Sequence, residues 1–123
     1  MLASLLFAAG CGLTGPSDDL SGHWVARSIG HSSSVGITLT QSGDSISGRA
    51  CAISDGHLLY SGAPVMGDYP DVAFTVGPAN TEPCCASQAG VRFRGKRDST
   101  KDIVGSYGTF DLRFERSPTP LCN

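Results

Sequence analysis

The chain has 123 residues, of which 40% are hydrophobic and 16% are charged, and its formal net charge is −2. This length allows one domain with a modest core, and the hydrophobic content excludes a disordered tail. The small net charge does not favour nucleic acid as a partner. No stretch approaches the roughly 20 apolar residues that span a bilayer as a helix.

The N-terminal stretch LLFAAGCG, residues 5–12, places a cysteine directly after an apolar run. Residues 2–7 are mostly apolar, and three small residues, Ala8, Ala9 and Gly10, precede Cys11. This order resembles the lipobox of bacterial lipoproteins. The resemblance implies that residues 1–10 are a signal peptide and that Cys11 is the lipidated N-terminus. An ordinary secretory signal and a buried first strand are the two alternatives.

The lipobox resemblance also implies where the protein lies in the cell. Several acyl chains on Cys11 would anchor it stably to a membrane of the bacterial envelope. In a Gram-negative organism we favour the outer membrane over the inner one. Residues 12–21 then form a flexible polar tether after the lipidated cysteine, and residues 22–123 form the folded domain. No basic residue precedes the short apolar run, so we expect the signal to be truncated at its start.

The folded domain shows short alternating segments separated by turn residues, which predicts an all-β sandwich or barrel of about eight antiparallel strands. The clearest hairpin is ITLTQSGDSISGRA, residues 37–50. The other predicted strands lie in residues 22–29, 56–62, 71–77, 90–96, 101–108 and 109–116. The alternation places Phe110, Leu112 and Phe114 inward. Residues 77–89 form the longest predicted loop.

An apolar residue, a spacer and a glycine recur at residues 46–48, 93–95 and 103–105. In each case the alternation places the glycine on the inward face of its strand. Glycine at such positions lets a strand bend sharply, as closure of a small barrel requires. The alternative is that the missing side chains leave room for a ligand.

The first predicted strand contains Gly22-His23-Trp24. This motif is similar to the glycine–x–tryptophan motif of the lipocalins, which avidin-like barrels also carry. The resemblance implies an up-and-down calycin-like barrel, with Trp24 closing one end and a ligand at the other. It also implies that Arg116, or Arg113 in its place, packs over the Trp24 ring as a cation–π pair. Trp24, Phe74, Phe93 and Phe110 are the candidates for lining a cavity.

Four cysteines follow Cys11, and an even number in an exported small domain indicates two disulfides. Of the three connectivities, we expect the one joining the adjacent Cys84 and Cys85 least, because neighbours rarely reach disulfide geometry. The favoured scheme joins this pair to Cys51 on one side and to Cys122 on the other. A metal site of these thiols with His23, His31 or His57 is the alternative, but no CxxC or HxxxH spacing supports it.

Nothing in the sequence forms a catalytic motif, so we expect no enzymatic activity, no cofactor and no metal. Seven of the nine basic residues lie at or after Arg92, and Arg92, Arg94 and Lys96 share one strand face. This face could be a patch for anionic lipid, lipopolysaccharide or cell-wall polymer, but we favour a solvated outer surface of the barrel. The preferred function is non-catalytic binding of a small apolar or amphipathic ligand in the barrel mouth. The alternative is a filled barrel whose surface contacts an envelope protein or cell-wall partner.

Overall fold

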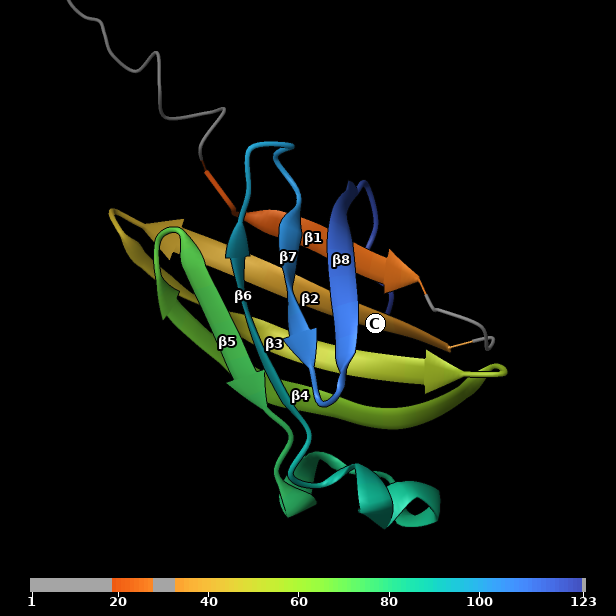
Figure 1. Ribbon diagram of the computed structural model, residues 1–123. Coiled ribbons are helices and arrows are strands. Elements are labelled where there is room, and N and C mark those ends of the chain that lie inside the picture. Colours follow the sequence, from red (N-terminus) through yellow and green to blue (C-terminus); the bar gives the residue numbers. More distant parts are fainter. Residues whose placement is uncertain (1–18, 28–32, 123) are drawn as a thin grey trace, which may run out of the picture.

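Eight antiparallel strands form one closed barrel in the computed structural model (Figure 1). The structure describes residues 19–27 and 33–122, so Cys11, the predicted signal peptide and His31 lie outside the described residues. The strands are β1 (Gly22–Arg27), β2 (Ser33–Ser42), β3 (Ser45–Ser54), β4 (His57–Asp68), β5 (Asp71–Thr75), β6 (Arg92–Arg97), β7 (Ile103–Tyr107) and β8 (Phe110–Ser117). Two short 3-10 helices, η2 (Pro78–Asn80) and η3 (Pro83–Gln88), connect β5 to β6.

Each strand pairs with the next one along the chain, and β1 pairs with β8 to close the sheet. The predicted fold class, an all-β up-and-down barrel, is therefore confirmed. Alternate residues point into the barrel, as the sequence pattern requires. The buried set includes Ile37 and Leu39 on β2, Val72 and Phe74 on β5, and Phe114 on β8.

The glycines of the apolar–x–glycine repeat lie where neighbouring strands approach each other closely. Gly95 on β6 is directly opposite Gly105 on β7. A Cβ atom on Gly105 would collide with the backbone of Arg94, and one on Gly48 would collide with the backbone of Thr38. These positions therefore favour bending and close approach of the strands rather than space for a ligand.

Replacing Gly105 with alanine should lower the free energy of unfolding by about 1–3 kcal/mol, because the backbone must move to admit the methyl group. Urea denaturation measures this change. Ser106→Ala, on the exposed outer face of the same strand, is the control and should change stability by less than about 0.5 kcal/mol. Equal stability of the two variants would contradict the close-approach explanation.

The folded domain begins before residue 22, the start that the sequence predicted for it. Leu20 is 0% exposed and belongs to the hydrophobic core. Its amide donates a hydrogen bond to Oε1 of Gln41, and its carbonyl accepts one from Nε1 of Trp24. Leu20 is therefore part of the folded domain, because it lies in the same core cluster as Trp24.

The disulfides join Cys51 to Cys122 and Cys84 to Cys85, so the favoured cysteine pairing is wrong. Cys51 lies on the outer face of β3, because its neighbours Ala50 and Ala52 point inward. The C-terminal tail reaches this face, where Leu121 occupies the space above Gly36 on β2. The position of the tail thus decides the first disulfide.

Cys84 and Cys85 lie in η3, beyond the barrel wall and beside β4 (Figure 1). With Cys51 already bonded to Cys122, each has the other as its partner within the described part of the chain. Adjacent cysteines rarely form a disulfide, but here the tail brings Cys122 to Cys51 and leaves Cys84 and Cys85 to each other.

Candidate ligand site at the barrel mouth

A cavity of about 490 Å³ opens at one end of the barrel, where β1 and β3 end and β2 begins. We call this end the mouth. Its walls come from residues of several strands, from the turn between β7 and β8, and from the end of η3 and the segment after it. The lining residues are Ala26, Ser33, Ser34, Val35, Ala52, Leu59, Gln88, Val91, Tyr107, Gly108, Thr109, Phe110 and Leu112. None of these side chains is charged, so the cavity suits an uncharged, mainly apolar molecule.

The four aromatic residues predicted to line a cavity are divided between the core and the mouth. Phe110 lines the mouth cavity. Trp24, Phe74 and Phe93 do not line it; they are at most 3% exposed and belong to the core cluster. The Phe93 ring packs against Phe114 at 5.1 Å and against Phe74 at 5.6 Å between ring centroids. These contacts fill the middle of the barrel.

Phe110 lies on the inward face of β8, as predicted, but it is not a core residue. It is 62% exposed, because it opens β8 directly after the turn from β7 and lies above the last buried layer of the barrel. The alternation of β8 is correct for Leu112 and Phe114, which are buried. Phe110 therefore forms an apolar rim at the mouth.

Two tyrosines that were not among the predicted site residues form a polar pair beside the cavity. The hydroxyl oxygens of Tyr60 on β4 and Tyr107 on β7 are 2.8 Å apart. Tyr107 lines the mouth, whereas Tyr60 is fully buried. The alternation through Ile103 and Gly105 already points Tyr107 inward, so the signal for this residue was present in the sequence.

Both hydroxyls stay protonated at neutral pH. Burial raises the pKa of Tyr60 far above its usual range, and the neighbouring Tyr107 raises it further. Burial also raises the pKa of Tyr107, and the hydrogen bond from Tyr60 partly offsets this effect. The pair therefore consists of two uncharged hydroxyl groups, which can donate or accept hydrogen bonds.

Stability should fall as the pH rises above about 10, because Tyr60 ionises in the unfolded chain but resists ionisation in the barrel. The pKa of Tyr60 is higher in the folded barrel than in the unfolded chain. Its contribution to the free energy of unfolding is therefore complete below the unfolded-state pKa and is lost as the pH rises above it. Urea denaturation between about pH 8 and pH 11 measures the fall. Tyr60→Phe should show a shallower decline, and identical pH profiles would contradict this assignment.

One wall of the mouth is held by the long connection between β5 and β6. The amide of Glu82 donates a hydrogen bond to the carbonyl oxygen of Leu59 at 2.9 Å, and Tyr60 forms a β-bridge with Thr81. These contacts fasten the connection along β4, where β5 no longer pairs with it. The disulfide between Cys84 and Cys85 lies within the same connection.

Trp24 closes the opposite end of the barrel together with Arg116. The guanidinium carbon of Arg116 lies 4.3 Å from the centre of the Trp24 ring, and the two residues are paired between β1 and β8. Arg116 also donates hydrogen bonds to the carbonyl oxygens of Ser21 and Asp19, each at 2.7 Å. The arginine thus covers the tryptophan and fastens the residues that enter β1.

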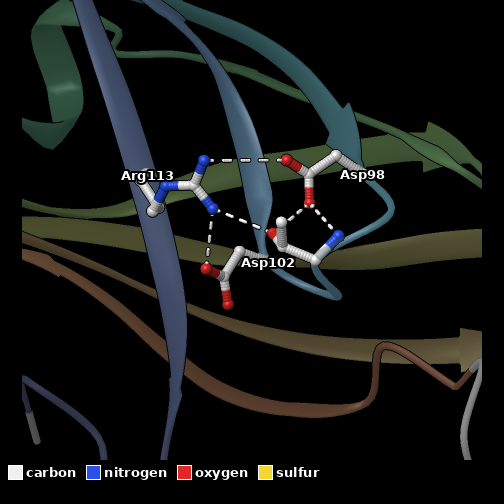
Figure 2. Close-up of polar contacts among 4 residues, drawn as sticks. Asp98, Asp102 and Arg113 are labelled. Carbon is white, nitrogen blue, oxygen red and sulfur yellow. Dashed lines mark hydrogen bonds and ion pairs between the residues drawn. The ribbon is translucent and has the colours of Figure 1, made fainter.

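Arg113, named as the substitute for Arg116, lies elsewhere and has carboxylate partners (Figure 2). Its guanidinium lies 2.8 Å from a carboxylate oxygen of Asp102 and 3.7 Å from one of Asp98. The Thr100 hydroxyl donates to Asp98, and this bond lowers the pKa of the Asp98 carboxyl. These partly exposed groups connect the β6–β7 loop to β8, so we assign them a structural role.

The remaining candidates do not form a second site in the described residues. Arg92, Arg94 and Lys96 project from the outer face of β6, with Lys96 opposite Asp71 on β5.

His23 contacts the hydroxyl of Thr38 at 3.0 Å, and His57 is exposed at the start of β4. Residues 19–27 and 33–122 contain no group of three histidine, cysteine, aspartate or glutamate side chains that could hold a metal. Within the same ranges, no helix is long and apolar enough to cross a membrane.

Together these features define a small, closed, antiparallel barrel with a tryptophan at one end and an apolar cavity at the other. Comparisons of the chain with protein-family models, with curated proteins and with solved structures found no match.

Proposed function

We propose that this protein is a non-catalytic lipoprotein of the bacterial cell envelope that holds a small apolar or amphipathic ligand in the barrel mouth. The observation that carries the proposal is the cavity of about 490 Å³, whose described lining is mainly apolar and contains no charged side chain. A cavity of this size and character is typical of small-molecule sites. The exposed Phe110 at its rim would lose contact with water when a ligand enters.

The envelope location rests on two features of the chain. The lipobox-like order before Cys11 supports lipid attachment at that residue. The two disulfides support an oxidising compartment, since such bonds are rare in a reducing cytosol. Metabolic labelling with an alkynyl fatty acid tests the anchor: the wild-type chain should be labelled, and Cys11→Ala should not.

Ligand binding can be tested with a dye that fluoresces in apolar surroundings, such as N-phenyl-1-naphthylamine. Its fluorescence should rise with the wild-type protein. Ala52→Phe should abolish the rise, because the larger side chain occupies the cavity. The matched control, Ala79→Phe, makes the same change on the exposed η2 and should bind the dye normally.

A folded wild-type protein that binds neither the dye nor a ligand retained from the cell would contradict the binding function. Native mass spectrometry of gently purified protein provides the second measurement. That result would favour the alternative function, in which the barrel acts through its outer surface on an envelope partner.

A further inference from the structure

The hydrogen-bonding capacity of the Tyr60–Tyr107 pair is not used up within the pair. Each tyrosine hydroxyl has one proton to donate, and one proton suffices for the contact of 2.8 Å between the two oxygens. The hydroxyl that accepts this bond keeps its own proton free for a third group. The identity of the accepting hydroxyl therefore decides where the remaining donor is directed.

Burial identifies Tyr60 as the donor within the pair. Its side chain is 0% exposed, and Tyr107 is its only polar side-chain partner within the described residues. If Tyr107 donated instead, the proton of Tyr60 would be buried without an acceptor, which is costly. Tyr60 therefore donates to Tyr107, and the proton of Tyr107 remains available. Tyr107 lines the mouth cavity and is only partly buried, so the cavity is the side from which a further group can reach this residue.

We propose that the Tyr107 hydroxyl donates a hydrogen bond to the ligand, and that the ligand is an uncharged amphipath carrying an acceptor such as a ketone or ester carbonyl. This inference rests on the proposed function, since it concerns the same cavity. Among the described residues, no charged side chain lines the cavity, and this supports an uncharged head group, because a carboxylate would lose its hydration without gaining a cation from them. The surrounding Leu112 and Val91 suit the apolar part of such a molecule.

Two other polar residues of the lining, Ser33 and Gln88, fit this role less well. Ser33 already donates its hydroxyl proton to Ser54 at 2.9 Å. Gln88 comes from η3 and carries both donors and an acceptor, so it would not select for an acceptor on the ligand. Gln88→Leu is consequently the control for the loss of any polar group at the mouth.

The test compares three benzene derivatives of similar size: acetophenone, with a carbonyl; ethylbenzene, without one; and benzoate, with a negative charge at pH 8. Titrations of the full chain followed by 15N–1H NMR give the dissociation constants. The decisive variants are Tyr60→Phe and the double variant Y60F/Y107F. The two variants differ only in the Tyr107 hydroxyl. Both lack the Tyr60 hydroxyl, so neither contains a buried donor at position 60 that has lost its acceptor.

Y60F should bind acetophenone within about twofold of the wild type, and Y60F/Y107F should bind it about five- to tenfold more weakly. Ethylbenzene affinity should be equal in these two variants, and benzoate should bind much more weakly than acetophenone to the wild type. Gln88→Leu should retain the acetophenone affinity.

Equal acetophenone affinity in Y60F and Y60F/Y107F, with ethylbenzene still bound, would overturn the role of Tyr107 and leave the proposed function intact. Benzoate bound as tightly as acetophenone would overturn the uncharged head group. Failure of the wild-type protein to bind any of the three compounds or the dye would overturn both proposals.

Discussion

Replacing Trp24 with alanine should lower the free energy of unfolding by about 3–5 kcal/mol, the usual cost of removing a large aromatic side chain from a core. Trp24 is 1% exposed and is covered by Arg116. The truncation would leave a hole beneath the guanidinium and remove the partner of the buried Leu20 carbonyl. Urea denaturation followed by circular dichroism measures the loss.

Two milder variants separate the contributions at this end of the barrel. Trp24→Phe keeps an aromatic ring but removes Nε1, so we expect a loss of about 1–3 kcal/mol for the unpaired carbonyl, in addition to the change in ring size. Arg116→Ala removes the cation–π contact and two hydrogen bonds at an exposed site, so it should cost less than Trp24→Ala. A Trp24→Ala variant as stable as Arg116→Ala would contradict the closing role of the tryptophan.

Removing the bond between Cys51 and Cys122 should cost about 4 kcal/mol, because it links residues separated by 71 positions and restricts the unfolded chain over that length. The double variant Cys51→Ala/Cys122→Ala tests this in urea, without a reductant that would also affect the second disulfide. The C-terminal tail would lose its covalent attachment, while Leu121 would keep only its packing against Gly36.

The second disulfide supplies a control within the same molecule. Cys84 and Cys85 are adjacent, so their bond encloses almost no chain and restricts the unfolded state little. Cys84→Ala/Cys85→Ala should therefore lower stability much less than the first double variant. If both double variants lost the same stability, the loop-closure explanation would be wrong.

The fold was predictable because it depends on a local pattern that repeats in every strand. Side chains alternate between the two faces of a strand, so Val72 and Phe74, or Leu112 and Phe114, indicate a buried face wherever they occur. Turn residues indicate where the strands end, and glycines indicate where they bend. Phe110 shows the limit of this reasoning, because alternation gives the direction of a side chain but not whether other residues cover it.

The site was only partly predictable. Phe110 was among the candidates for the cavity, but the aromatic residues expected beside it lie in the filled part of the barrel. The Tyr60–Tyr107 pair joins residues 47 positions apart on strands that are not neighbours. Such a contact across the interior depends on the barrel's closure and width.

The sequence by itself determined the strand-rich fold and the inward faces, because these follow from residue order and local alternation. The pairing candidates Trp24 and Arg116 came from the resemblance to the glycine–x–tryptophan motif of the lipocalins. The tertiary structure alone decided the cysteine partners, the inclusion of Leu20 in the core and the division between a filled end and an open mouth. The physical reason is that these features depend on distances between segments far apart in the chain, which local preferences do not encode.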